Sequence, residues 1–258
     1  MIFLSRQTLT AIDCAADLLR ESKHAVVLTG AGISTPSGIP DFRSEGTGLW
    51  SRAGPLEVAS LMTFRASPEK FFDWFRPLAS QIFNAQPNLA HRALANLERA
   101  GRLHKIVTQN IDGLHQKAGA QHVIETHGTL RTLSCTRCYH QVESGPYFQP
   151  FVEQGKLPYC PKCGAVLKPD VILFGEQLPH RAWVEAQRAA SRCDLILVAG
   201  SSLEVLPVAG LPMQALDRGA RLVIINNSPT YLNVRADVTI LEDVAQVVPA
   251  IAEKILHG

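Results

Sequence analysis

The sequence predicts an α/β fold in which a mostly parallel sheet carries helices on both faces. Two observations predict it. Apolar runs typical of buried parallel strands alternate along the chain with stretches of helical period. Polar or glycine-rich loops directly follow five of these runs, and ligands bind beside the carboxyl ends of parallel strands. These loops cover residues 30–43, 109–112, 126–128, 200–202 and 226–227.

Each predicted element has its own signal. Leu9, Ile12, Ala16 and Leu19 recur at helical spacing, and Pro68 suits the first turn of the second helix. We expect helices at 8–21, 69–83, 88–99, 181–190, 208–217 and 244–255. We expect strands at 25–29, 104–108, 123–125, 195–199, 222–225 and 238–241.

Composition narrows the class of protein. Of the 258 residues, 46% are hydrophobic, which is enough for a sizeable core. A formal net charge of +2 is too small to predict binding to nucleic acid or to an anionic membrane. No stretch approaches the ~20 apolar residues of a membrane span, and residues 1–10 lack the apolar core of a secretory signal. We therefore expect a cytoplasmic protein that binds neither nucleic acid nor membranes.

The glycine-rich loop at residues 30–32 leaves the first apolar run. Glycines let the backbone approach a pyrophosphate closely and present its N–H groups. The third glycine comes late, at Gly38, so the spacing differs from the Gly-x-Gly-x-x-Gly dinucleotide pattern, and a tight turn without a ligand explains the glycines equally well. The continuation Pro-Asp-Phe-Arg at residues 40–43 favours a nucleotide site. The glycine-containing stretch 44–66 that follows is then typical of a lid loop.

Four of the six cysteines form two Cys-x-x-Cys pairs, Cys135 with Cys138 and Cys160 with Cys163. Two such pairs can complete a tetrahedron of thiolates, and four thiolates with no open position are typical of structural zinc. Inside a cell, a metal explains them better than disulfides do. Two unrelated pairs or redox cysteines remain the alternative. We expect one zinc ion per chain, holding together a small module at residues 133–169.

His127 follows a short predicted strand, where a side chain with a near-neutral pKa suits a general base. Asp112 is equally explained as a turn residue, and Ser201 as a helix cap. Asn226 ends an apolar run at a place where dehydrogenases of this architecture carry an acidic residue, which disfavours hydride chemistry. The histidines left as structural are His91, His104, His115 and His140.

Taken in order, these motifs resemble the sirtuin family. They are residues 30–34 (Gly-Ala-Gly-Ile-Ser), 40–43, 108–112 (Thr-Gln-Asn-Ile-Asp), 127–128 (His-Gly), the four paired cysteines, 174–176 (Phe-Gly-Glu) and 200–202 (Gly-Ser-Ser). The resemblance runs from about residue 25 to residue 244. It implies NAD-dependent removal of acyl groups from protein lysines, with an acyl-lysine peptide bound between a Rossmann-like domain and a small zinc domain.

The resemblance also implies roles for individual residues. His127 would be the base acting on the ribose hydroxyls, and Asn110 would orient the nicotinamide ribose. NAD would be contacted by Gly30, Ala31, Gly32, Thr35, Phe42, Arg43, Gln109, Ile111, Asp112, Gly200, Ser201, Ser202, Asn226 and Val244. Val171, Leu173 and Phe174 would contact the acyl-lysine peptide.

The implied domain division has three parts. Residues 1–43, 88–132 and 170–258 would form the Rossmann-like NAD-binding domain, residues 44–87 a lid loop and helical insert, and residues 133–169 the zinc-binding module. We expect a monomer that binds acyl-lysine proteins or peptides.

The acyl preference follows from the helix after the lid. Sirtuins that remove succinyl or malonyl groups resemble one another in a Tyr-x-x-Arg pair there. Phe72 and Phe75 stand at those two places, and Arg76 lies one residue further, about 100° around the helix. An unpaired buried carboxylate is costly, so we expect acetyl and longer apolar acyl groups as substrates.

Two alternative functions stay open at this level. One is mono-ADP-ribosyl transfer to protein in the same pocket. The other is a non-catalytic NAD-sensing module, which predicts damaged catalytic positions, whereas His127, Asn110 and Asp112 are intact.

Overall fold

The computed structural model describes residues 4–41 and 55–257, and its larger sheet has six strands, all parallel. Their order in space is β3-β2-β1-β7-β8-β9. The strands are β1 (Ala25–Thr29), β2 (Lys105–Thr108), β3 (Val123–Glu125), β7 (Leu195–Ala199), β8 (Arg221–Ile225) and β9 (Val238–Ile240). Every residue of β1 and β7 is buried, which explains why these segments are continuous apolar runs. The predicted parallel sheet is confirmed.

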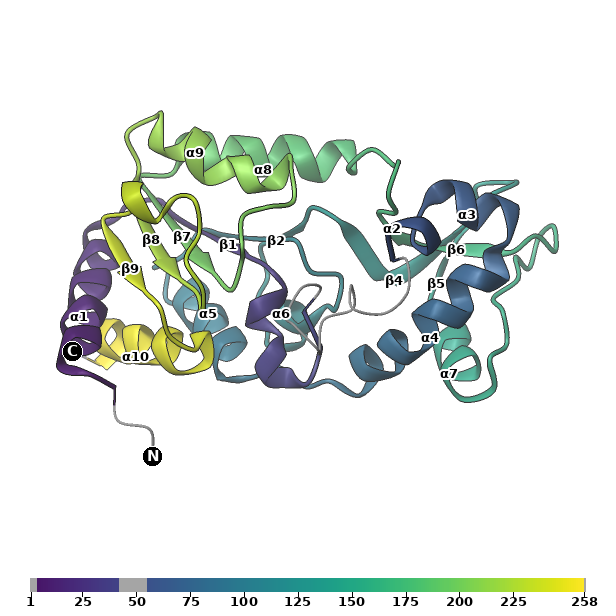
Figure 1. The fold of residues 1–258 in the computed structure, drawn as a ribbon, viewed down its shortest axis with the longest axis horizontal. Coiled ribbons are helices and arrows are strands. Elements are labelled where there is room, and N and C mark those ends of the chain that lie inside the picture. The colour runs from purple at the N-terminus through teal and green to yellow at the C-terminus, as the bar shows by residue number, and fades with distance from the viewer. Residues whose placement is uncertain (1–3, 42–54, 258) are drawn as a thin grey trace.

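Helices cover both faces of this sheet, as predicted (Figure 1). One layer consists of α1 (Arg6–Glu21), α5 (Leu89–Arg99) and α10 (Val244–His257), and the other of α8 (His180–Arg192) and α9 (Leu211–Leu216). Successive residues of a strand point to opposite faces. Val27 of β1 therefore packs in the first layer, and Val26 and Leu28 pack in the second.

A second lobe lies at one end of the large sheet (Figure 1). Its three-stranded antiparallel sheet has the order β5-β4-β6. The elements of the lobe are α2 (Pro55–Val58), α3 (Leu61–Ala66), α4 (Pro68–Asn84), β4 (Gly128–Cys135), β5 (Gln141–Glu143), α7 (Gly145–Gln154) and β6 (Leu167–Val171). Phe72 of α4 packs edge-on against Phe151 of α7, in one apolar cluster with Leu130 and Leu173. The helical insert and the small sheet thus share a core.

Three details differ from the sequence-based expectation. The stretch predicted as loop contains α2 and α3, and Ser60 caps α3 by accepting a hydrogen bond from the Thr63 N–H at 3.1 Å. The predicted helix at 208–217 is a short 3₁₀ turn, η4 (Val208–Gly210), followed by α9. The small sheet also begins at Gly128, upstream of residue 133, where the zinc module was expected to start.

The other described elements are short. They are the 3₁₀ turns η1 (Ala31–Ile33), η2 (Thr35–Ser37) and η5 (Asn233–Arg235), and the single helical turn α6 (Leu114–Lys117). Among the helices that the structure describes, none combines the length and the apolar character needed to cross a membrane.

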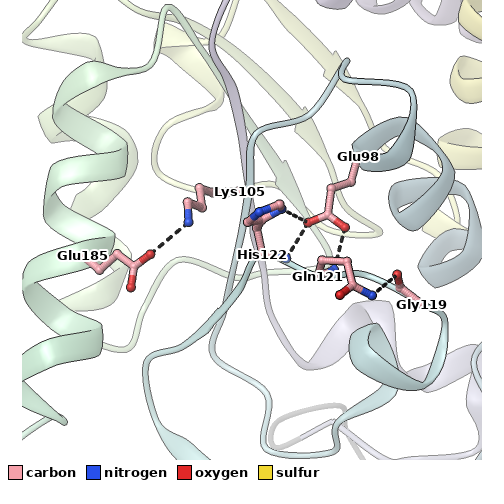
Figure 2. A network of polar contacts seen from close by, with 6 residues as sticks. All are labelled: Glu98, Lys105, Gly119, Gln121, His122 and Glu185. Carbon is pink, nitrogen blue, oxygen red and sulfur yellow. Dashed lines mark hydrogen bonds and ion pairs between the residues drawn. The ribbon is translucent and has the colours of Figure 1, made fainter.

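A buried carboxylate fixes the turn that leads into β3 (Figure 2). Glu98, near the end of α5, accepts hydrogen bonds from the backbone N–H groups of Gln121 and His122, both at 2.7 Å, and lies 3.2 Å from Nδ1 of His122. An ion pair between Lys105 and Glu185, at 3.0 Å, joins β2 to α8 in the same view. These contacts set the position of β3, whose far end leads to His127.

Candidate functional site

The expected site residues gather along one edge of the large sheet. The loops after β1, β2, β3, β7 and β8 all leave the carboxyl ends of parallel strands, so they meet at this edge. The loops expected to form the site are therefore neighbours in space. Phe42 and Arg43, both expected at the nicotinamide end of NAD, lie outside the described residues.

The glycines of the first loop pack against those of another. The N–H of Gly32 donates to the carbonyl of Gly200 at 2.9 Å. A Cβ atom on Gly32 would lie 2.9 Å from that same carbonyl oxygen, and one on Gly200, whose φ is +66°, would lie 2.3 Å from the nitrogen of Ile33. The glycines are thus required first by the contact between the loops that follow β1 and β7. Within residues 31–41 the structure describes two short 3₁₀ turns and no α-helix, in keeping with Pro36 and Pro40 in the loop.

A polar network joins the loops after β1 and β2. The amide nitrogen Nδ2 of Asn110 donates to the carbonyl of Gly30 at 3.1 Å and to the hydroxyl of Ser34 at 3.0 Å. Ser34 donates in turn to Oδ2 of Asp112 at 2.6 Å, and Oδ1 of Asp112 accepts the N–H of Leu114 at 2.9 Å. The side chains of Ser34 and Asp112 are buried. Among the described contacts, Nδ2 of Asn110 is committed to the protein, so Oδ1 is the atom left to accept a hydrogen bond from a ligand.

His127 lies just after β3 and is half-buried. Its Nδ1 lies 3.0 Å from the carbonyl oxygen of Gln109. A carbonyl oxygen can only accept, so Nδ1 carries the proton and Nε2 is the basic nitrogen. Burial lowers the pKa of His127 below its usual 6.5, and the hydrogen bond to Gln109 acts in the opposite direction. The imidazole is therefore neutral at pH 7 and can accept a proton.

Two loops that were expected to bind NAD are tied together by Gln109. Its Nε2 donates to the hydroxyl of Ser201 at 2.9 Å, and that hydroxyl also accepts the N–H of Leu203 at 3.3 Å. Ser202, next in the chain, is exposed at the same edge.

The other residues expected at NAD have local partners. Thr35 donates to the carbonyl of Gly32, and Asn226 donates to the carbonyl of Ser228. Val244 is buried in the core at the start of α10, while Ala31 and Ile111 are half-buried.

The segment expected to meet the peptide follows β6. Val171 and Leu173 are buried, and Phe174 is partly exposed. The backbone N–H of Phe174 donates to the carbonyl of Ala59, and the carbonyl of Phe174 accepts the N–H of Leu61 at 3.0 Å. The N–H of Ile172 donates to the carbonyl of His127 at 2.9 Å. The peptide segment is therefore linked both to the helical insert and to the expected catalytic histidine.

The four paired cysteines form one cluster. All four Sγ atoms lie within 4.8 Å of one another, with Cys135 and Cys163 3.4 Å apart and Cys138 and Cys160 3.6 Å apart. Sulfurs of a tetrahedral site lie about 3.8 Å apart, because Zn–S bonds are about 2.3 Å long. The cluster suits structural zinc.

The helix α4 buries Phe72 and Phe75 and directs Arg76 elsewhere. Phe72 and Phe75 are buried. The guanidinium of Arg76 donates from Nε to the carbonyl of Val152 at 2.9 Å and from a terminal nitrogen to that of Glu153 at 2.8 Å, near the end of α7. Arg76 is thus occupied at a helix end, away from Phe72 and Phe75.

Sequence patterns missed the buried groups beneath the site. Ser34 joins Asn110 to Asp112, and His115, left as a structural histidine, lies 2.9 Å from the hydroxyl of Thr29. The rings of His91 and His115 meet edge to face at 4.9 Å. Burial lowers the pKa of His91 to about 4, although the negative charge of Asp112 acts to raise it. The sequence signal that could have identified His91 is the presence of a polar residue among the apolar residues of the buried face of α5.

Comparison with known proteins gives a consistent result. The pattern of the Sir2 family matches residues 30–207. The NAD-dependent protein deacylase 2 of Archaeoglobus fulgidus is 45% identical over 242 residues, which is 93% of this chain and 94% of that protein. The NAD-dependent protein deacetylase 1 of Geobacillus kaustophilus is 48% identical over 222 residues, which is 86% of this chain and 89% of that protein.

Solved structures agree with the sequence matches. A Sir2 complex with a deacetylated p53 peptide and 3′-O-acetyl ADP-ribose superposes with a TM-score of 0.88 at 37% identity, covering 94% of this chain and 98% of that one. A Sir2 protein bound to a propionylated peptide superposes with a TM-score of 0.84 at 37% identity, with the same coverage.

Proposed function

Because the chain belongs to the Sir2 family and is an NAD-dependent protein deacylase, we propose that His127 and Asn110 act on the nicotinamide ribose while the acyl group of a modified lysine moves to ADP-ribose. NAD is consumed in this reaction, so it is a substrate. The observation that carries the proposal is the meeting of His127, Asn110 and Asp112 at the ligand-binding edge of the sheet, each held by its own hydrogen bonds.

His127 is the proposed base. Its Nδ1–H is held by Gln109, so Nε2 is the free basic nitrogen, and burial keeps it neutral. In the proposed sequence, the acyl oxygen bonds to the ribosyl carbon as the bond to nicotinamide breaks, and nicotinamide leaves with the electron pair. Nε2 then takes a proton from a ribose hydroxyl, whose oxygen closes onto the acyl carbon. The bond from that carbon to the lysine nitrogen then breaks, and the lysine leaves as an amine with the proton that His127 took. Water adds to the acyl carbon, which frees the original acyl oxygen as a hydroxyl on the ribosyl carbon and leaves the acyl group as an ester on ADP-ribose. Proximity supplies much of the rate, because an amide oxygen is a weak nucleophile.

Asn110 and Asp112 are proposed to bind the nicotinamide end of NAD. Oδ1 of Asn110 can accept a hydrogen bond from a ribose hydroxyl, because its Nδ2 is held by Gly30 and Ser34. Each carboxylate oxygen of Asp112 accepts one protein hydrogen bond and has room for a second, which suits the carboxamide of nicotinamide. The rest of the proposed NAD site is Gly30, Ala31, Gly32, Thr35, Phe42, Arg43, Gln109, Ile111, Gly200, Ser201, Ser202, Asn226 and Val244.

The acyl-lysine peptide is proposed to bind along Val171, Leu173 and Phe174. We propose acetyl and longer apolar acyl groups as the substrates. The burial of Phe72 and Phe75 and the use of Arg76 at the end of α7 support this, since none of these three side chains then offers a cation to an acyl carboxylate.

We also propose that the chain works as a monomer in the cytoplasm and binds no nucleic acid, which its net charge of +2 supports. The division into an NAD-binding domain (1–43, 88–132, 170–258), an insert (44–87) and a zinc module (133–169) remains a proposal, with β4 crossing one of its boundaries.

The proposed function is tested with acyl-lysine peptides and NAD, following nicotinamide release and peptide mass together. We expect one deacylated peptide and one acylated ADP-ribose for each nicotinamide released. ADP-ribose attached to protein, with no loss of acyl groups, would instead establish ADP-ribosyl transfer. If NAD binds but no nicotinamide is released in either assay, the result would support a non-catalytic NAD-sensing module.

A further inference from the structure

A continuous line of hydrogen bonds runs from a buried histidine to Asn110. Nε2 of His115 lies 2.9 Å from the hydroxyl of Thr29, and that hydroxyl donates to the hydroxyl of Thr108 at 2.9 Å. The Thr108 hydroxyl also accepts the backbone N–H of Asn110 at 3.1 Å. His115, Thr29 and Thr108 are all buried.

The directions of these bonds are fixed. The hydrogen of the Thr29 hydroxyl goes to Thr108, so Thr29 must accept from Nε2–H of His115. His115 is therefore the neutral tautomer with its proton on Nε2. Its Nδ1 is buried without a hydrogen-bond partner in the described part of the chain, so the ring makes its hydrogen bond through Nε2.

A second line returns from Asn110 to the start of α6. It passes from Nδ2 of Asn110 through Ser34 to Asp112, and Asp112 accepts the N–H of Leu114, the neighbour of His115. The backbone of Asn110 is thus held from one side and its amide from the other, with both lines ending at residues 114 and 115. These two lines of hydrogen bonds hold the side-chain amide of Asn110 in a single orientation. Buried hydrogen-bond networks of this kind are costly to break.

We propose that His115 is a positioning residue for the NAD reaction, which through Thr29 and Thr108 holds Asn110 in register with the nicotinamide ribose. The proposal rests on the proposed function for its effect on turnover. It assigns a role to a histidine that does not reach the ligand-binding edge itself.

The test compares two substitutions at His115. His115→Phe keeps an aromatic ring but removes the donor to Thr29, whereas His115→Gln can keep a donor near the position of Nε2. We expect His115→Phe to lower kcat/KM for NAD by about ten- to a hundredfold, the range that a small displacement of a reacting group produces. His115→Gln should restore turnover. His104→Gln is the matched control, because His104 lies at the opposite end of β2, where its ring packs against His24, and makes no hydrogen bond to Asn110 among the described residues.

Coupling to Asn110 separates positioning from general damage. If His115 acts through Asn110, the double variant His115→Phe/Asn110→Ala should be no slower than Asn110→Ala alone. Should His115→Phe fail to fold, Thr108→Val and Thr108→Ser repeat the comparison, since only serine keeps the hydroxyl that holds the Asn110 N–H.

A readout independent of turnover is the NMR signal of the Asn110 side-chain amide, which should shift in His115→Phe and return in His115→Gln. Equal loss of activity in both His115 variants, additive effects with Asn110→Ala, or wild-type turnover in folded His115→Phe would each overturn the inference. If the wild-type protein shows no deacylation, the proposed function fails, and the Asn110 signal alone decides the inference.

Discussion

At His127, one hydrogen bond decides which ring nitrogen can do chemistry. With Nδ1–H held by Gln109, Nε2 is the only base the ring can offer. We expect His127→Ala to lower deacylation by at least about a hundredfold, the usual contribution of a general base, while NAD still binds. His180→Ala is the control, because His180 is exposed at the start of α8. Deacylation by His127→Ala within a few-fold of wild type would remove His127 from the mechanism.

The pKa of His127 also determines the pH below which kcat/KM falls. The base must be neutral to act, and burial places its pKa below 6.5. We therefore expect kcat/KM to be flat near pH 7 and to fall only below about pH 6.5. A pH profile of kcat/KM with an acetyl-lysine peptide measures this directly. An acid limb centred at or above pH 7 would mean that His127 is not the group being titrated.

Among the elements, the small sheet depends on its cysteines. β4 carries Cys135 at one end and begins at Gly128, directly after His127, so disorder in this sheet reaches the site. We expect chelation of zinc, or Cys160→Ser, to disorder the small sheet and to lower activity indirectly, since the cluster offers no open position for chemistry. Metal analysis should find one zinc per chain. Cys14→Ser is the control, as Cys14 lies outside the cluster.

A metal-free protein with four free thiols and full activity would contradict this assignment.

The helix α4 governs the proposed acyl preference. We expect acetyl and butyryl versions of one peptide to be turned over well and the succinyl version poorly, because Phe72 and Phe75 offer no counter-charge. Arg76→Ala should leave the ratio of succinyl to acetyl turnover unchanged. It should lower the melting temperature, because the Arg76 guanidinium donates hydrogen bonds to backbone carbonyls of α7. Succinyl turnover equal to that of acetyl, or a ratio that changes in Arg76→Ala, would show that a cation does reach the acyl group.

The elements that sequence could predict are those with a local signal. Strands β1, β3 and β7 were predicted with their observed bounds. For β1 and β7 the signal is a continuous apolar run, because both strands are buried on both faces, whereas β3 is only partly buried. The helices α2 and α3 were missed because they are short, and because α3 is anchored by Phe174, which lies far along the chain. The roles of Ser34 and His115 were missed for a similar reason. Their partners lie 76 and 86 residues away in sequence, and only the closed fold brings them together.

At the scale of the whole molecule, buried neutral histidines make the fold sensitive to acid. The pKa of His91 is about 4 in the folded chain, against 6.5 when exposed, because burial disfavours its charged form. Burial also places the pKa of His115 well below 6.5. Between pH 4 and pH 6.5 the unfolded chain binds more protons than the folded one. The free energy of unfolding therefore rises with pH in this range and falls as the solution is acidified. This contribution is complete above about pH 6.5 and is lost progressively toward pH 4.

We therefore expect the free energy of unfolding to drop steeply between pH 6.5 and 4, with His91 contributing a slope of up to about 1.4 kcal/mol per pH unit. Urea titrations at a series of pH values measure the slope. His91→Gln removes one titrating group and should flatten the curve, whereas His180→Gln, at an exposed position at the start of α8, should leave it unchanged. A slope that is the same in wild type and His91→Gln would show that His91 is charged in the folded protein. In that case Nδ1 of His91, which is buried without a hydrogen-bond partner among the described residues, would carry the second proton, and burial would not keep this ring neutral.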